Sequence, residues 1–368
     1  MTPKKVAIVG LGDISTIYLD TIKNVFDNLE LYGVCTHRYE KAVEVAEKYG
    51  VPKVFRTIDD VCADPEVEIV VNLTRPSDHF EINMKALKAG KHVYTEKPLA
   101  PTLAEGKQIL DYAAEKGLVV GGAPDTIFGG MLQSARRYLD DGIIGKPIGA
   151  QVFMTNAGNE RWHPNPEFFY KKGAGPMLDV GPYYLTALVH LLGSVDMVAG
   201  MAQISDTRHV VTSQPYYGRE IEVEATTFQT GILKFSSGII GTIFLTFDGH
   251  GPDTHGFKIF GTEGILSIDR QPFMFDGTIR MTHSGDEGYT ELPVLYGYNE
   301  DTRGIGVSDM ARAIDEKRLP RSSGQLMYHV LEISEALEKS SEQQSMIALQ
   351  SRVERPEPIR FSKVRGEY

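Results

Sequence analysis

The segment Tyr94-Thr95-Glu96-Lys97-Pro98-Leu99 presents an ammonium group at a constrained point of the chain. It follows a short β-like run, Lys91-His92-Val93, and precedes a helical pattern. A residue before proline is disfavoured in the helical region, so we expect Lys97 at the end of a strand. In an open α/β sheet, ligands bind at this edge. The alternative is a surface lysine in a strand–helix loop.

A glycine turn near the N-terminus has the spacing of a dinucleotide site. Lys5 to Gly10 is an unbroken apolar run, as in a buried parallel strand, and a helical pattern starts at Thr16. Glycines between strand and helix let a pyrophosphate approach the helix N-terminus, where N–H groups favour an anion. Ser15 replaces the third glycine of the G-x-G-x-x-G pattern and is small enough for close packing. The residues predicted to bind the cofactor here are Gly10, Leu11, Gly12, Asp13 and Ile14; the alternative is a structural turn.

The second predicted strand, Leu29 to Cys35, ends in Thr36-His37-Arg38. An NAD-binding chain usually has an acidic residue there for the ribose 2′-hydroxyl. A hydroxyl and two basic groups suit a 2′-phosphate better, so NADP is favoured over NAD. The alternative is that Thr36, His37 and Arg38 are solvated residues that start the next helix.

Strands and helices alternate through the first third of the chain, which predicts a doubly wound parallel sheet. Thr74 and Lys97 both follow predicted strands, so we expect them to line one crevice. The further segments are strands at 54–55, 68–73, 91–93 and 118–120 and helices at 39–49, 58–63, 80–89 and 103–116.

Size and charge exclude several classes of protein. The 368 residues suffice for two domains, and the net charge of −11 argues against a nucleic-acid or anionic-membrane partner. Cys35 and Cys62 have neither a disulfide framework nor metal-ligand spacing, which favours the cytoplasm. No apolar run approaches the roughly 18 residues of a membrane span.

Four segments together resemble the Gfo/Idh/MocA oxidoreductases: G-L-G-D-I-S, T-R-P-S-D-H, A-G-K-H-V-Y-T-E-K-P-L-A and G-A-G-P-M-L-D-V-G-P-Y-Y. The resemblance extends over essentially the whole chain. It implies an α/β protein with an N-terminal Rossmann domain, residues 1–123, and a C-terminal α/β domain, residues 124–368. The second domain would hold a large, mostly antiparallel open sheet that often supports dimers or tetramers. Such proteins oxidise or reduce hydroxyl and keto groups, mostly on sugars and cyclitols.

The sequence pattern of the second half of the chain agrees in outline with the C-terminal domain that the resemblance implies. Short runs separated by turn residues predict strands, and Ser236-Ser237-Gly238 predicts a hairpin turn. We expect strands at 148–153, 197–204, 221–229, 231–235, 241–247, 258–260 and 358–361, and helices at 131–140, 306–317 and 324–339.

The resemblance also implies site residues. Lys97 would contact substrate and nicotinamide, and Thr74, His79 and Glu96 would lie at the cofactor. Asp179 and Tyr183 are four apart, which would put them on one face of a helix that begins close to Pro182. Most of the family has a histidine where this chain has Tyr183. A tyrosine with a pKa of about 10 is a poor base unless a cation such as Lys97 lowers that pKa; alternatively, Tyr183 only packs.

A stiff loop from Gly158 to Pro166 holds the only tryptophan. Trp162 offers a flat face for a sugar ring, and His163 titrates near neutrality. This W-H-P segment and Ala123-Pro124-Asp125-Thr126 resemble those of one branch of the family. Asp125 could accept hydrogen bonds from sugar hydroxyls or cap a helix, and His163 could instead be a solvated loop residue.

These observations predict a cytoplasmic NAD(P)-dependent dehydrogenase that acts on a sugar, cyclitol or derivative. Lys97, Asp179 and Tyr183 would hold the reacting hydroxyl, and Tyr183, Lys97 or His163 would accept its proton. One alternative is a glycosidase that recycles its nicotinamide through transient oxidation and elimination. Another is a non-enzymatic, nucleotide-dependent sensor. No metal is expected, and the partners would be a small carbohydrate-like molecule and further copies of the chain.

Overall fold

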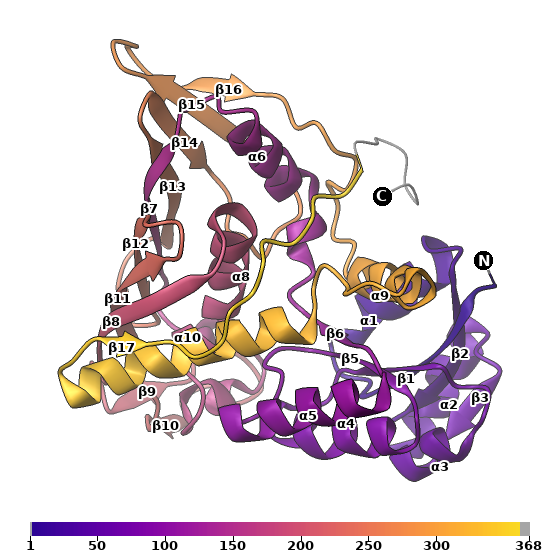
Figure 1. Cartoon of the computed structure of the whole chain (residues 1–368). Helices are drawn as coiled ribbons and strands as arrows, with labels where there is room; N and C mark the ends of the chain where they lie inside the picture. The colour runs from indigo at the N-terminus through magenta and orange to yellow at the C-terminus, as the bar shows by residue number, and fades with distance from the viewer. Residues whose placement is uncertain (1, 361–368) are drawn as a thin grey trace. The chain divides into compact units, whose positions relative to one another are not determined.

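The computed structural model describes residues 2–360, and contacts within it divide the chain into two compact units (Figure 1). The first unit contains the residues up to Gly130, Tyr296–Tyr328 and the chain from Pro356 onward. The second contains Met131–Leu295 and His329–Arg355. This division differs from the expected one at residue 123, because the chain returns to the first unit after leaving it. Helix α9 (Ile305–Glu316) packs on strand β6 there.

A six-stranded parallel sheet forms the first unit, in the order β3-β2-β1-β4-β5-β6. The expected doubly wound sheet is therefore confirmed. The strand order reverses between β1 and β4, which is the switch point where such sheets bind ligands. The strands are β1 (Lys4–Val9), β2 (Leu29–Cys35), β3 (Lys53–Phe55), β4 (Ile69–Asn72), β5 (His92–Thr95) and β6 (Val120–Gly122), and the helices α1 (Ser15–Asn24), α2 (Tyr39–Tyr49), α3 (Ile58–Ala63), α4 (His79–Lys88) and α5 (Leu103–Lys116).

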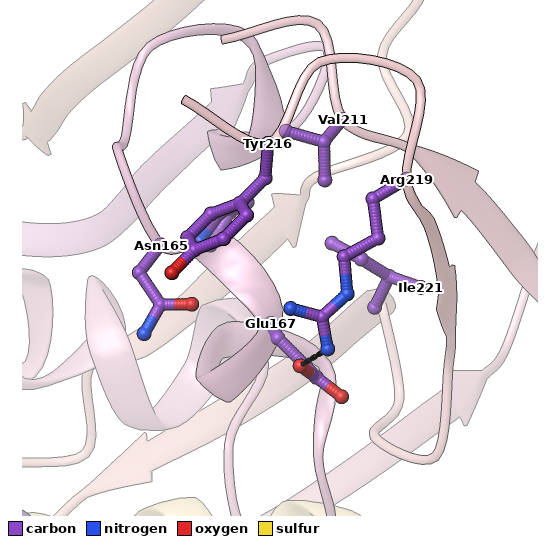
Figure 2. A pocket seen from close by; sticks show the side chains of 7 residues that line it. Asn165, Glu167, Val211, Tyr216, Arg219 and Ile221 are labelled. Atoms are coloured by element: carbon purple, nitrogen blue, oxygen red, sulfur yellow. Dashed lines mark hydrogen bonds and ion pairs between the residues drawn. The ribbon is translucent and has the colours of Figure 1, made fainter. Parts of the chain in front are cut away.

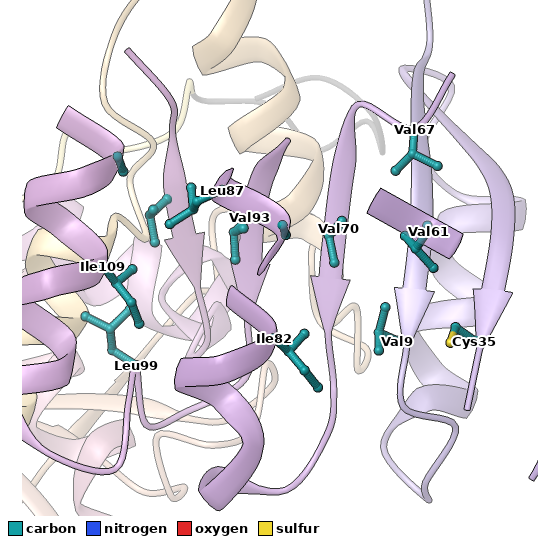
Figure 3. Packing of buried hydrophobic residues seen from close by; sticks show 14 of the residues in the cluster. Val9, Cys35, Val61, Val67, Val70, Ile82, Leu87, Val93, Leu99 and Ile109 are labelled. Carbon is teal, nitrogen blue, oxygen red and sulfur yellow. The ribbon is translucent and has the colours of Figure 1, made fainter. Parts of the chain in front are cut away.

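Buried aliphatic side chains hold helices onto this sheet (Figure 3). Val70 and Val93 come from the central strands, and Ile82 and Leu87 come from the inner face of α4. Apolar burial of this kind contributes roughly 25 cal/mol per Å². The packing fixes α4 against β4 and β5, whose C-terminal ends carry candidate site residues.

The sixth strand begins two residues later than the 118–120 run predicts. Leu118 donates its N–H to Ala113 O and thus still belongs to the turn that ends α5. The N–H of Val119 donates to His92 Nδ1. Strand pairing therefore begins only at Val120.

The second unit is built on a nine-stranded sheet in the order β16-β15-β14-β13-β7-β12-β11-β8-β17. All neighbours are antiparallel except β7 and β12, so the predicted large, mostly antiparallel sheet is confirmed. The strands are β7 (Pro147–Thr155), β8 (Val195–Gln203), β11 (Phe228–Phe235), β12 (Ile240–Thr246), β13 (Thr254–Gly261), β14 (Gly264–Ile268), β15 (Ile279–His283), β16 (Thr290–Leu292) and β17 (Ile347–Ala348). The other helices are α6 (Gly130–Asp140), α7 (Pro176–Asp179), α8 (Gly181–Leu192) and α10 (Gly324–Gln343).

Several predicted strands need correction. The run 221–229 is not one strand, because the N–H groups of Glu224 and Ala225 turn away to bond Tyr170 O. Its first part joins β10 (Glu220–Glu222), which pairs with β9 (Arg208–Val210) in a separate two-stranded sheet, and its end joins β11. Strands β14 to β17 were not predicted. Of the predicted strand at 358–361, residues 358–360 form none, and residue 361 lies outside the described residues. Within the described residues, no helix is long and apolar enough to cross a membrane.

Candidate active site

The turn after β1 has the form that a pyrophosphate site requires. Gly10 has a φ of +96°, and a Cβ there would lie 2.7 Å from the backbone of Leu73, so only glycine fits. A Cβ on Gly12 would meet no atom within 4 Å, which leaves open space beside the turn. Ile14 precedes α1 without a side-chain cap. The turn thus combines space with a helix N-terminus, the combination that suits a phosphate group.

Basic side chains gather at the ends of β2 and β3. Thr36 is half-buried, whereas His37 and Arg38 are exposed. Arg56 directly follows β3, and its guanidinium lies 3.9 Å from the ring centre of Tyr39. The sequence patterns did not single out Arg56, although it is a basic residue after a strand, as Arg38 is.

Glu96 turns inward, away from the position expected of a cofactor ligand. It is 8% exposed, and its carboxylate accepts hydrogen bonds from Tyr18 Oη at 2.9 Å and from the N–H of Lys97 at 3.1 Å. Burial raises the pKa of Tyr18 well above its usual value, so the phenol remains a donor to Glu96. Glu96 therefore holds the backbone at Lys97, just beyond the end of β5.

His79 is completely buried and bridges two loops. Its Nδ1 lies 2.6 Å from Pro98 O, and its Nε2 lies 3.2 Å from Thr74 O. Burial lowers the pKa of His79, although both carbonyl contacts oppose that shift. The neutral ring donates one hydrogen bond, and the shorter contact identifies Pro98 O as the acceptor. His79 thus positions the segment around Lys97.

Asn72 and Asn83 form a second buried connection between the two loops that His79 bridges. Asn72 donates to Asn83 Oδ1 at 2.9 Å, and Asn83 donates to Leu99 O at 3.3 Å. Thr74 donates to Asn72 Oδ1 through its N–H at 3.1 Å and its hydroxyl at 2.6 Å. We call Asn72, His79 and Asn83 the interloop network. It ties the loop after β4 to the loop after β5, and the sequence patterns did not reveal it.

Asp125 is a helix cap rather than an accessible substrate ligand. It is 1% exposed, and its Oδ2 accepts the N–H groups of Gly304 at 2.8 Å and Gly306 at 3.1 Å. Burial raises its pKa to about 6, while the bond from Gly306 opposes the shift. Between the two interpretations of the sequence, the structure shows the cap at the start of α9. Sugar hydroxyls cannot reach this carboxylate because its own unit encloses it.

Asp179 and Tyr183 lie on consecutive helices, not on one face of a single helix. Asp179 is the last residue of α7, and Tyr183 lies in the first turn of α8. Pro182 lacks an N–H, so it interrupts the helical ladder and starts α8, as its position predicted. Both side chains are half-buried, and the ring of Tyr183 lies edge-on to Phe273, with centroids 5.8 Å apart.

The loop with Trp162 and His163 presents aromatic surface. Trp162 is 63% exposed, and His163 contacts both Trp162 and Phe169 with ring centroids 5.2 Å apart. His163 Nδ1 accepts the N–H of Asn165 at 3.0 Å. A neutral imidazole has only one lone pair available, so its Nε2 carries the hydrogen. His163 is therefore arranged to donate a hydrogen bond, not to accept a proton.

A small hollow lies in the second unit. It encloses about 150 Å³, open to solvent, between a short helical turn and the β9–β10 hairpin (Figure 2). Arg219 pairs with Glu167 across it at 2.5 Å, so its charged groups are mutually satisfied. Within residues 2–360, no cluster of three or more His, Cys, Asp or Glu side chains could hold a metal ion.

The first unit brings Thr74, His79, Glu96 and Lys97 together beside the strand ends. With the glycine turn at the switch point, this arrangement defines a Rossmann-type nucleotide-binding protein. Family models match in both parts of the chain: the oxidoreductase family with an NAD-binding Rossmann fold over residues 4–122, and the Gfo/Idh/MocA C-terminal domain over residues 132–267. The chain belongs to the Gfo/Idh/MocA oxidoreductases.

Several relatives are named for activities on sugars and cyclitols. Myo-inositol 2-dehydrogenase of Thermotoga maritima is 22% identical over 94% of this chain and 98% of its own. Levoglucosan dehydrogenase of Pseudarthrobacter phenanthrenivorans is 25% identical over 84% of this chain and 86% of its own. A solved levoglucosan dehydrogenase with NADH and L-sorbose has the same fold, with a TM-score of 0.82 at 21% identity over 95% and 100% of the two chains. The expected branch and the exchange of the usual histidine for Tyr183 stay predictions.

Proposed function

We propose that this protein is an NAD(P)-dependent dehydrogenase that interconverts a hydroxyl and a keto group on a sugar, cyclitol or sugar derivative. The observation that carries the proposal is the fixed position of Lys97 beside a nucleotide-binding turn. Glu96 holds its backbone N–H, and His79 holds the carbonyl of Pro98. The activities of the relatives support a polyhydroxylated substrate.

The bound nicotinamide would supply the hydride acceptor or donor. We assign the pyrophosphate to the turn from Gly10 to Ile14, whose backbone and open space suit it. Lys97 would donate to the oxygen of the reacting carbon, and Asp179 and Tyr183 would orient that hydroxyl. Of the three candidate proton acceptors, the hydrogen bond to His163 Nδ1 disfavours His163. Proton transfer is therefore assigned to Lys97 or Tyr183.

We propose a preference for NADP over NAD. Arg38 is exposed at the end of β2, and Arg56 adds a second guanidinium after the neighbouring β3. Two cations at one edge suit a 2′-phosphate because guanidinium groups bind phosphate through paired N–H donors. The thiols of Cys35 and Cys62 support the cytoplasm as the proposed location.

We also propose that copies of the chain associate through the open face of the nine-stranded sheet. Met201, Ile232 and Ile240 share that face by strand register, and each is at least half exposed. The other face is covered by α8, where Tyr184 stacks on Phe257, and by α10, where Leu337 contacts Gly231. Exposed apolar patches of this kind mark protein interfaces.

Incubation with NAD or NADP and a panel of sugars and cyclitols tests the proposed activity. We expect net change in nicotinamide absorbance with at least one polyhydroxylated substrate. Release of an aglycone without net reduction would instead indicate a glycosidase that recycles its cofactor. Cofactor binding with neither outcome across a broad panel would indicate a sensor and contradict the proposal.

A further inference from the structure

A buried histidine lies between two carboxylates in the second unit. His209 Nδ1 is 2.8 Å from Glu160 Oε1, and its Nε2 is 3.2 Å from Asp248 Oδ1. All three side chains are less than 10% exposed. The first contact is a hydrogen bond, whereas the second is an ion pair without hydrogen-bond direction. We call these three residues the carboxylate–imidazole cluster.

Neighbouring side chains also contact this cluster. The ring of Tyr170 packs over that of His209, with centroids 4.6 Å apart and planes 31° apart. The phenol of Tyr170 donates to Glu160, and the hydroxyl of Thr227 donates to Asp248. Tyr170 also accepts the N–H of Asn159 at 3.1 Å. Among the described residues, the charged groups paired with His209 are Glu160 and Asp248, and the titratable phenol of Tyr170 packs on its ring.

The cluster joins three segments that are distant in sequence. Glu160 lies two residues before Trp162, His209 lies in β9, and Asp248 follows β12. The cluster thus links the loop with Trp162 to the β9–β10 hairpin and to the segment after β12.

Backbone contacts carry the same connection to His163. The carbonyl of Glu160 accepts the N–H groups of Thr212 at 3.1 Å and Ser213 at 3.0 Å. Ser213 Oγ donates to His163 O at 2.6 Å. The hairpin that carries His209 therefore also fixes the backbone at His163.

We propose that His209, as an imidazolium between Glu160 and Asp248, is a positioning residue that holds the loop of Trp162 and His163 in the conformation that receives the sugar ring. This rests on the proposed function, because it takes Trp162 and His163 as ligands of the proposed sugar substrate. His209 itself touches neither cofactor nor substrate and acts only through the loop.

The charge balance supports this assignment. Two buried carboxylates beside a neutral ring would leave two uncompensated negative charges, whereas an imidazolium between them leaves a net charge of −1. Burial lowers the pKa of His209, but the contacts with Asp248 and Glu160 outweigh it and raise the pKa to about 9. The same contacts lower the pKa values of Glu160 and Asp248 despite their burial. The cluster thus carries its charges at neutral pH.

The single tryptophan gives the test a local probe, because all tryptophan fluorescence comes from Trp162. We would measure acrylamide quenching of the protein without substrate for wild type, His209→Gln and Asp248→Asn. The control is His255→Gln, which removes a half-buried histidine of the same unit that lies 3.2 Å from Asp269 O. Quenching should rise in both cluster variants and stay unchanged in the control. In wild type it should rise with pH, with a midpoint near 9.

Kinetics with the substrate found in the panel form the second arm. We expect His209→Gln to raise KM about tenfold while kcat changes less than about threefold, because the loop binds the ring and does not carry the chemistry. Unchanged quenching in Asp248→Asn and in a folded His209→Gln would overturn the proposal, as would a fall in kcat without a change in KM. Altered quenching in a protein that turns over no substrate would confirm the loop contact and contradict the proposed function instead.

Discussion

At the scale of single residues, the proposed chemistry depends on one ammonium group and the atoms that fix its backbone. Lys97 follows β5, and Glu96 accepts its N–H from the protein interior. The buried carboxylate of Glu96 accepts hydrogen bonds from a backbone N–H and from a phenol O–H. Because these two donors replace water at the carboxylate, Glu96 can anchor the backbone from the interior. The sequence singled out Glu96 but suggested a cofactor contact, because a linear pattern does not show which way a side chain turns.

Replacing Lys97 with alanine tests its chemical role. We expect Lys97→Ala to bind the cofactor with a dissociation constant within about threefold of wild type. Turnover should fall at least about 100-fold, since a positioned proton-transfer group contributes that much or more. Cofactor titration by nicotinamide fluorescence and steady-state assays measure the two quantities. Turnover close to that of wild type would contradict the assignment.

Replacing Arg38 with alanine tests the cofactor preference. Loss of one charge-assisted contact to a 2′-phosphate should weaken NADP binding by about tenfold and leave NAD binding unchanged. Calorimetric titration with both cofactors measures the ratio of the dissociation constants for NAD and NADP. Arg56→Ala is the companion variant, and we expect it to change the ratio in the same direction. An equal loss of affinity for NAD and NADP in both variants would argue against a 2′-phosphate site.

At the scale of elements, α4 connects two loops that both serve the candidate site. Its apolar face packs on β4 and β5, and on the same side His79 and Asn83 reach carbonyl groups beyond Lys97. Three fully buried polar side chains would be costly without such partners. The interloop network therefore couples the backbone near Thr74 to the position of Lys97.

His79→Asn tests this coupling. We expect kcat to fall about tenfold or more with little change in cofactor affinity, because a small displacement of a catalytic group is expensive. His92→Asn is the matched control, since His92 is a half-buried histidine that accepts the N–H of Val119 at the opposite end of β5. Both variants should melt earlier than wild type, but only His79→Asn should lose turnover. Equal losses of kcat would mean that His79 merely stabilises the fold.

At the scale of the whole molecule, a buried charge cluster and an exposed apolar face bear on stability and on the proposed association. The carboxylate–imidazole cluster joins three segments, and the open sheet face exposes aliphatic side chains such as Ile232. Both features arise from residues far apart in sequence that the fold brings together. Each leads to a prediction that needs no substrate.

The cluster predicts how stability depends on pH. The pKa of His209 is raised from 6.5 to about 9, so its contribution is complete below pH 6.5 and is lost as the pH rises through 9. This difference in pKa between the unfolded and folded states corresponds to a contribution of about 3 kcal/mol to the free energy of unfolding. Wild type should therefore lose more stability between pH 6.5 and 9.5 than His209→Gln in denaturant titrations. Parallel pH curves for the two proteins would contradict the charged state of the cluster.

Ile232→Glu tests the proposed interface. A carboxylate in the middle of an apolar contact would be buried without a partner, so we expect a smaller assembly in sedimentation velocity. Glu287→Gln, at an exposed position outside the sheet strands, is the control and should leave the sedimentation coefficient unchanged. A wild-type monomer, or an Ile232→Glu protein of unchanged size, would remove the sheet face from consideration.

Local patterns sufficed for much of the first unit. The apolar run before Gly10, the alternation of strands and helices, and the proline after Lys97 are short-range constraints on backbone geometry, and the structure confirms the parallel sheet that they predict. The predicted helices 39–49, 58–63 and 103–116 match α2, α3 and α5 because their limits depend on nearby capping residues such as Thr57 and Thr102.

Only the tertiary structure decided the features that depend on distant partners. Asp125 caps α9 because the segment with Gly304 and Gly306 belongs to the first unit. The sequence near Asp125 does not indicate that these distant N–H groups are its partners. The pairing of Glu160 with His209 joins residues 49 positions apart. Side-chain direction and long-range pairing are properties of the packed chain, whereas a linear pattern encodes only periodicity and local backbone preference.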